Sequence, residues 1–300
     1  NIIRSDTYLK YVLYYRMKKW ISPIPKKIHL IWIGGDPPDY FKYFLETFIK
    51  NMPEFEIKIW GNKDLNKKNF PITYEYIKKA KKYHGKPMRE DNDLGGHVLY
   101  NSEGEPYLHS KWAQITDLMR LEIVYTHGGY YFDTTFEILK PMYNIFNKKY
   151  KFVGCNEVPR FKNVSFLSNS FFGAIKKSPI LRRLLTKSRL NKIDLESMYV
   201  DSETGPAYLR SGIKLSDNYH IFPTKYFYPF VEEYEPGVNP PYRKASKNKC
   251  HSKKKTKKKK RLKNKKGYIE FPCKKYPKSY ALKHWQLGKS WSIPDKYYYS

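Results

Sequence analysis

The chain has 300 residues, and its 58 Lys and Arg against 28 Asp and Glu give a formal net charge of +30. Its hydrophobic content of 40% is enough to bury a substantial core, which excludes wholesale disorder. No run approaches the roughly 18 to 20 apolar residues that a membrane-spanning helix needs. A membrane anchor is therefore expected only from a segment removed from the N-terminus, and a cytoplasmic and a secretory-lumen location both stay open.

Half of the net charge lies in a basic tract, residues 243–266, which holds fifteen Lys or Arg and no Asp or Glu. Such a run repels itself and buries nothing, so it predicts a disordered insertion. One interpretation is that it attracts an anionic partner, such as nucleic acid, a membrane surface or an acidic glycan. A solvated insertion is favoured over nucleic-acid binding, because the tract lacks the interleaved aromatic residues that single-strand binding uses.

The rest of the chain alternates strand and helix patterns without an internal repeat, which predicts an α/β fold. Residues 1–24 are expected to form an N-terminal helical segment, and residues 25–300 a single domain that carries the basic tract as an insertion. Strands are predicted at 28–33, 55–60, 130–132, 151–155, 166–167, 171–175, 219–222 and 280–282. Helices are predicted at 37–49, 72–83, 112–125, 180–188 and 205–211.

The end of the first predicted strand is one candidate ligand site, because ligands of open α/β sheets bind beyond the carboxyl ends of the strands. Trp32 stands there with a large flat ring, and Gly34 and Gly35 behind it would let the backbone approach a ligand closely. A core tryptophan followed by an ordinary turn is the alternative.

A second candidate is Asp133, a carboxylate at the mouth of the strand that follows a predicted helix. Because side chains alternate in a strand, Asp133, Thr135 and Glu137 are expected to share one face, with Glu137 roughly 13 Å from Asp133. Only Asp133 and Thr135 can then meet at one ion.

A series of motifs runs along the chain in a fixed order: HLIWIGG at 29–35, TDLMR at 116–120, GGYYFDTT at 128–135 with LKP at 139–141, SNSFFGA at 168–174, TGP at 204–206, HW at 284–285 and SW at 290–291. Together they resemble glycosyltransferases of family 32, which have an Asp-x-Asp sugar-binding region and are related to clostridial toxin glucosyltransferase domains and initiation-specific mannosyltransferases. The resemblance covers roughly residues 25–291. It implies a GT-A fold, that is, a Rossmann-like, mixed, mainly parallel sheet flanked by helices, and a nucleotide-sugar donor, Mn²⁺ or Mg²⁺, and retention of anomeric configuration.

For the nucleotide, the resemblance implies that Trp32 stacks on the base, because a flat apolar ring is a favourable partner for it. Ile31 would supply backbone contacts, and Thr116 would lie nearby. Ser290 and Trp291 would close over the diphosphate.

For the sugar and the chemistry, the resemblance implies a catalytic set of Asp117, Arg120, Asp133 and Asn169. Asp117 would contact sugar hydroxyls, and Arg120 would reach sugar or phosphate from the same helix face. Tyr131 and Asp133 would contact ribose and donor sugar, and Asn169 would sit beside the anomeric carbon. Without the surrounding motifs, Asp117 and Arg120 would be interpreted as a helix-surface ion pair.

The implied metal ligands are Asp133, Thr135 and His284, and Thr135 departs from the family pattern, which has a second aspartate at this position. A neutral hydroxyl removes one negative charge from the shell of a hard cation. Three outcomes follow: a cation held weakly by diphosphate, water, Asp133 and His284; a metal-independent enzyme; or a descendant that only binds. Lys283 also stands where some relatives have a further histidine.

The sequence thus favours a retaining glycosyltransferase that moves a hexosyl group to a glycan or protein acceptor, an anionic one if the basic tract recruits it. The Trp32 strand favours UDP-sugars over GDP-mannose. A catalytically silent nucleotide-sugar-binding protein and a basic nucleic-acid-binding protein stay open as alternatives. The departing diphosphate could itself take the acceptor's proton, so no protein nucleophile is required.

Overall fold

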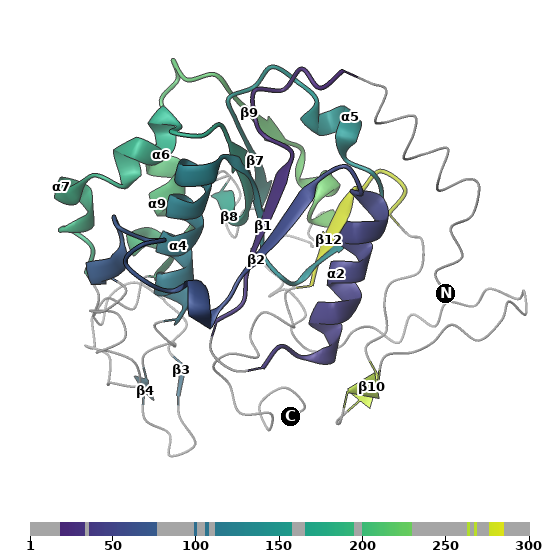
Figure 1. Cartoon of the computed structure of the whole chain (residues 1–300), viewed down its shortest axis with the longest axis horizontal. Helices are drawn as coiled ribbons and strands as arrows, with labels where there is room; N and C mark the ends of the chain where they lie inside the picture. The colour runs from purple at the N-terminus through teal and green to yellow at the C-terminus, as the bar shows by residue number, and fades with distance from the viewer. Residues whose placement is uncertain are drawn as a thin grey trace, which may run out of the picture.

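The computed structural model describes residues 19–33, 36–76, 99–100, 106–107, 112–157, 166–194, 200–229, 263–264, 267–268 and 276–284. Its centre is a six-stranded sheet of order β2-β1-β5-β8-β7-β9, with helices on both faces (Figure 1). The strands are β1 (Lys27–Ile31), β2 (Glu56–Trp60), β5 (Gly129–Phe132), β7 (Phe152–Glu157), β8 (Phe166–Ala174) and β9 (Tyr219–Phe222).

The sheet is mixed and mainly parallel. Strand β1 runs parallel to β2 and β5, and β7 runs parallel to β9, whereas β8 is antiparallel to both β5 and β7. Five strands therefore point one way and β8 the other. This confirms the predicted fold class, a mainly parallel α/β sheet flanked by helices in a single domain.

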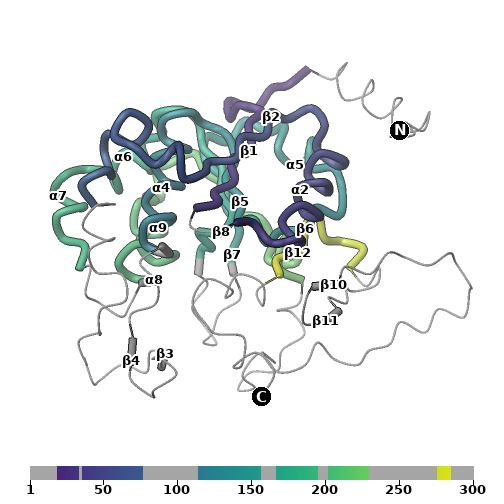
Figure 2. Tube along the Cα trace, turned by 60° about the horizontal axis from the view of Figure 1, so that its bottom comes forward, coloured from purple at the N-terminus to yellow at the C-terminus, as the bar shows by residue number. Residues whose placement is uncertain are grey.

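The two faces of the sheet bury two separate hydrophobic clusters, because side chains alternate along each strand. On one face, Leu30 packs in a cluster with Phe48 of α2 (Asp39–Asn51). On the other, Ile31 packs in a cluster with Met119 of α4 (Trp112–His127) and with side chains of α6 (Pro179–Leu184) and α9 (Pro206–Ser211). Beside α2, a short antiparallel pair forms from β6 (Phe136–Ile138) and β12 (Ala281–Lys283) (Figure 2).

The remaining described elements are short: α5 (Tyr143–Phe146), α7 (Lys187–Leu190), α8 (Val200–Glu203), η1 (Asn62–Asp64), η2 (Thr224–Tyr226), and the pairs β3 (Leu99–Tyr100) with β4 (Pro106–Tyr107) and β10 (Lys263–Asn264) with β11 (Gly267–Tyr268). Among the described residues, no helix combines the length and apolar character needed to cross a membrane.

Several predicted boundaries are wrong. The strands expected at 166–167 and 171–175 are one strand, β8, and the helix expected at 180–188 is divided into α6 and α7. The strand through Asp133 does not continue, because β5 ends at Phe132 and a turn leads into β6, whose partner is β12. Asp133, Thr135 and Glu137 therefore do not share one strand.

Three expected segments lie largely outside the described residues. Of the N-terminal helical segment, residues 19–24 are described and are not helical, which corrects that part of the prediction. Of the helix at 72–83, residues 74–76 are described as helical. Of the basic tract, Lys263–Asn264 is described, as β10 paired with β11, and the predicted disordered insertion otherwise lies outside the described residues.

Candidate functional site

The strand order switches direction between β1 and β5. The chain passes from β1 through α2 to β2 on one side of β1, and then through α4 to β5 on the other side. In α/β sheets, the crevice for a ligand lies at such a switch point, outside the carboxyl ends of the strands. Trp32 follows β1 and Asp133 follows β5, so the two residues singled out from sequence stand at this edge.

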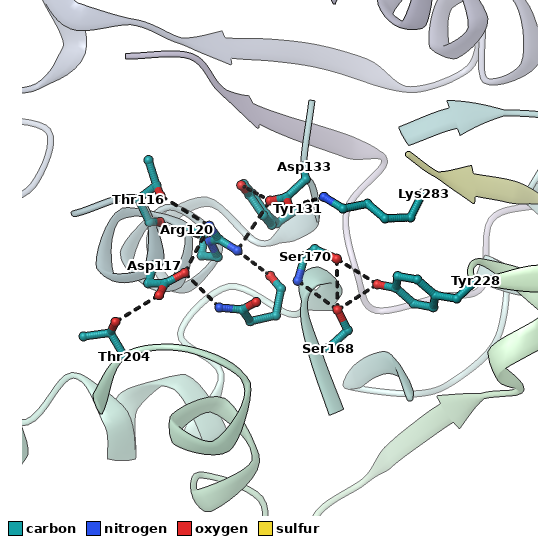
Figure 3. Close-up of polar contacts among 11 residues, drawn as sticks. Thr116, Asp117, Arg120, Tyr131, Asp133, Ser168, Ser170, Thr204, Tyr228 and Lys283 are labelled. Carbon is teal, nitrogen blue, oxygen red and sulfur yellow. Dashed lines mark hydrogen bonds and ion pairs between the residues drawn. The ribbon is translucent and has the colours of Figure 1, made fainter. Parts of the chain in front are cut away.

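Asp133 lies between two cations, as Figure 3 shows. Its Oδ2 accepts a hydrogen bond from Lys283 Nζ, and its Oδ1 lies 3.4 Å from Arg120 Nη1 and accepts a bond of 2.8 Å from the Tyr131 hydroxyl. Burial raises the pKa of the Asp133 carboxyl, but the Lys283 and Arg120 charges outweigh burial and leave the pKa below its usual value. Asp133 is therefore ionised at neutral pH.

Arg120 is buried on α4 and connects this carboxylate to its surroundings. Its Nε donates to the Thr116 carbonyl at 3.1 Å, and its Nη1 donates to the Asn169 carbonyl at 2.9 Å. Its guanidinium lies over the Tyr131 ring, 4.7 Å from the centroid. Burial opposes the charged form, but Tyr131, Asp117 and Asp133 outweigh burial and raise the pKa of Arg120.

Asp117 lies on the same helix, and its carboxylate is buried among donors. Oδ1 lies 3.1 Å from Arg120 Nη2 and accepts a bond of 2.8 Å from Asn169 Nδ2, while Oδ2 accepts one of 2.9 Å from the Thr204 hydroxyl. Side-chain exposures of 7% for Asp117 and 8% for Arg120 show that the alternative of a surface ion pair is wrong. The spacing of three residues on a helix thus brings a buried pair to the site.

The residues expected at the nucleobase lie on β1 and α4. Trp32 is half-buried, its backbone N–H donates to the Trp60 carbonyl at 2.9 Å, and its ring lies 5.4 Å from that of Phe41. The Ile31 side chain belongs to the core, and its backbone pairs with Trp60. The Thr116 hydroxyl lies 3.4 Å from Arg120 Nη2. Gly34, Gly35, Ser290 and Trp291 lie outside the described residues.

The implied metal ligands do not converge on Asp133. The Thr135 hydroxyl is buried and has no hydrogen-bond partner among the described residues, while the Thr135 carbonyl accepts from the His284 backbone at 2.9 Å. The His284 ring stacks on Phe44, with centroids 4.8 Å apart, and its Nε2 lies 3.0 Å from Glu137 Oε2. His284 is thus turned to a different carboxylate from the one that Lys283 contacts.

A divalent cation prefers several free carboxylate oxygens, whereas the Asp133 carboxylate already faces an ammonium and a guanidinium. Within the part of the chain that the structure describes, no group of three or more His, Cys, Asp and Glu could hold a metal ion. The donor set at Asp133 therefore does not fit Mn²⁺ or Mg²⁺.

Sequence reasoning assigned no role to several residues that build the site. Lys283 and Thr204 each contact one of the two carboxylates directly. Below Asp133, the hydroxyls of Ser168, Ser170 and Tyr228 bond to one another at 2.8 to 2.9 Å, and the Ser170 carbonyl accepts from the Asp133 backbone. The signals available were the TGP and SNS motifs and the lysine at 283, next to His284.

Comparison with protein families finds one match, over part of the chain. The family described as "Glycosyltransferase sugar-binding region containing DXD motif" matches residues 38–153, which include α2, α4, β5 and Asp133. This part of the chain is thus similar to glycosyltransferases that have a DXD-type sugar-binding region, in agreement with the resemblance that the motifs indicate. In this chain the motif is Asp133-Thr134-Thr135.

Three solved structures are similar, and two of them are described as domains of toxins. The PaToxG glycosyltransferase is 17% identical with a TM-score of 0.45, over 69% of this chain and 74% of that one. The UDP-bound glycosyltransferase domain of the YGT toxin is 12% identical with a TM-score of 0.38, over 66% and 79%. The catalytic domain of alpha-toxin from Clostridium novyi is 13% identical with a TM-score of 0.38, over 70% and 76%. No curated protein matches the chain.

Proposed function

We propose that this glycosyltransferase transfers a hexosyl group from a nucleotide-sugar, with retention of configuration, to a glycan or protein acceptor. The observation that carries the proposal is the cluster of Arg120, Asp117, Asn169 and Lys283 around Asp133, at the switch point of the sheet. UDP-sugars are the favoured donors, and GDP-mannose is the alternative.

The nucleotide would lie along the carboxyl ends of β1 and β5. The half-buried Trp32 ring, which lies 5.4 Å from the Phe41 ring, would stack on the base. The donor sugar would then extend toward Asp133, whose side chain is 25% exposed and is the most open of the cluster's carboxylates. Ser290 and Trp291 are proposed to cover the diphosphate, on the strength of the motif alone.

Asp117 is better suited to positioning than to direct contact with sugar. Its two carboxylate oxygens accept from Arg120, Asn169 and Thr204, so it fixes the guanidinium and the Asn169 amide together. Asn169 is only partly buried and comes from β8, next to β5, which supports its proposed place beside the anomeric carbon.

In the reaction, the bond between the anomeric carbon and the phosphate oxygen breaks, and its electron pair goes to the departing diphosphate. The acceptor hydroxyl oxygen bonds to the anomeric carbon on the same face, and its proton passes to the diphosphate. The positive charges of Arg120 and Lys283 offset the charge that develops on the leaving group, because preformed charges in a water-poor site stabilise it strongly. Asp133 orients the sugar.

The acceptor is proposed to be anionic if the basic tract recruits it. Replacing residues 243–266 with a short Gly/Ser linker should then raise the acceptor KM and flatten its salt dependence, since screened Coulomb attraction is lost. Unchanged acceptor kinetics at every ionic strength would identify the tract as a solvated insertion.

A silent nucleotide-sugar-binding protein is the second candidate, because Thr135 replaces a carboxylate and its hydroxyl is enclosed. Calorimetric titration with UDP-sugars and GDP-mannose, followed by measurement of donor hydrolysis, separates the two. Binding with slow hydrolysis supports the enzyme, and binding without hydrolysis or transfer supports the silent form. Binding of oligonucleotides alone would favour a nucleic-acid-binding protein instead.

Asp133→Asn tests the site within the same assay. The variant should lose donor hydrolysis, since the amide carries no charge to hold Lys283 and Arg120 in place. Asp217→Asn is the matched control, because Asp217 pairs with Arg183 away from the cluster. Full activity of Asp133→Asn would contradict the proposed site.

A further inference from the structure

Lys283 is held in a fixed position at the donor edge of the sheet. It ends β12, where it pairs with Phe136 of β6, and its backbone N–H donates to the Phe227 carbonyl at 3.2 Å. Its side chain is 4% exposed, and Nζ lies 5.3 Å from the centroid of the Phe136 ring and bonds to Asp133 Oδ2. Figure 3 shows the side chain extending toward Asp133 from the side opposite Arg120.

The charges at this point balance without a metal ion. The net charge of two carboxylates with one divalent cation is zero, and the net charge of one carboxylate with one ammonium is also zero. This chain has Thr135 in place of the second carboxylate, and Lys283 supplies a single positive charge at the first. The loss of a negative charge at 135 and the presence of a fixed positive charge at 283 are therefore complementary.

We propose that Lys283 supplies, at Asp133, the positive charge that binds the diphosphate of the donor, so that this protein binds its donor without a divalent cation. The inference rests on the proposed function and specifies how that site recognises its ligand. An ammonium has three N–H donors and a full charge, so one group can contact a carboxylate and a phosphate oxygen together.

Arg120 is less suited to this task. Its guanidinium faces the Thr116 and Asn169 carbonyls and the carboxylates of Asp117 and Asp133. A guanidinium has five N–H donors in a rigid plane, so turning it toward a phosphate would break bonds to buried oxygens. Lys283 has a compact charge with three donors, so Nζ can contact a phosphate oxygen while it keeps its bond to Asp133.

The first experiment is calorimetric titration of the unmodified protein with UDP and with GDP, in EDTA and then in Mn²⁺. The expected result is that the better-binding nucleotide has the same affinity within about threefold in the two conditions. Tightening of more than tenfold by Mn²⁺ would overturn the inference and leave the proposed function intact. Binding of neither nucleotide in either condition would instead contradict the proposed function.

The second experiment compares Lys283→Gln with the unmodified protein, using the nucleoside diphosphate and the nucleoside without phosphate, both in EDTA. Diphosphate binding should weaken by about 10- to 100-fold, the range for losing a charged hydrogen bond, while nucleoside binding is unchanged. Lys58→Gln is the matched control, since Lys58 pairs with Asp64 at 3.3 Å on β2 and η1. Equal weakening of both ligands, or of neither, would refute the role.

If Lys283→Gln fails to fold, the titration of the unmodified protein with and without Mn²⁺ still tests whether the donor binds without a divalent cation. Direct Mn²⁺ binding, measured from the paramagnetic resonance signal of the free ion, gives an independent readout. In the presence of saturating nucleoside diphosphate, no specific uptake of Mn²⁺ is expected. Stoichiometric uptake at micromolar Mn²⁺ would overturn the inference.

Discussion

Replacing Arg120 with glutamine removes the charge that joins the two carboxylates of the site. Asp117 would keep the Asn169 amide and the Thr204 hydroxyl but lose its ion pair, while Asp133 would keep Lys283 and Tyr131. With a side-chain exposure of 7%, the Asp117 carboxylate cannot recover this loss by hydration. Breaking a buried ion pair by removing one partner costs about 3 to 5 kcal/mol, so the free energy of unfolding should fall by that amount.

Chemical denaturation followed by circular dichroism and tryptophan fluorescence measures this loss. Arg189→Gln is the matched control, because Arg189 is only partly buried and its hydrogen bond to the Ser211 hydroxyl is exposed. Its effect should stay within about 0.5 kcal/mol, as is usual for surface substitutions.

A double-mutant cycle with Asp117→Asn tests the physical reason. In this variant, the amide oxygen at position 117 can still accept a hydrogen bond from Asn169. Its amide nitrogen can donate to the Thr204 hydroxyl, because a hydroxyl accepts as well as donates. The double variant should therefore be more stable than the sum of the two single losses predicts, by about 1 to 3 kcal/mol. A loss below 1 kcal/mol for Arg120→Gln, or simple additivity, would show that the pair is not electrostatically coupled.

Three further predictions concern the base, an acid-sensitive histidine and a tight turn. Trp32→Ala should weaken binding of UDP or GDP by about 1 to 3 kcal/mol in calorimetry, and unchanged affinity in a folded variant would exclude stacking. His29 is buried and bonded to the Gly128 carbonyl at 2.8 Å, and burial lowers its pKa to about 4. In the unfolded chain His29 binds a proton more readily than in the folded protein. The free energy of unfolding should therefore fall by about 3 kcal/mol between pH 6.5 and pH 4, and His29→Gln should lack this contribution. Gly129→Ala should lower the free energy of unfolding, measured by chemical denaturation, by about 1 to 3 kcal/mol. The reason is that φ is +103° and a Cβ would lie 2.6 Å from the Lys27 carbonyl oxygen.

The sequence by itself determined the main elements, because their patterns are local. The apolar run at 28–33 predicts β1, and helical spacing from 112 onward predicts α4. The end of α4 is also readable, since Gly128 adopts a φ of +66° that glycine favours, and its N–H donates to the Val124 carbonyl. The motif order indicated a resemblance to one family, and the positions after β1 and β5 indicated the edge of the sheet where Trp32 and Asp133 lie.

Only the tertiary structure decided what these residues contact. Asp117 and Arg120 could have been a surface pair, and it is the packing of α4 against β8 and the Thr204 turn that buries them. The end of β5 at Phe132 depends on β6 finding β12 as its partner, which no local pattern encodes.

The contact between Lys283 and Asp133 shows this limit most clearly. The two residues are 150 positions apart, and composition, periodicity and spacing act over a few residues only. The motif indicated His284 as the residue facing the site, whereas strand pairing turns His284 to Glu137 and Lys283 to Asp133. Because neighbouring side chains on a strand point to opposite faces, the register between β12 and β6 decides which of the two reaches the carboxylate.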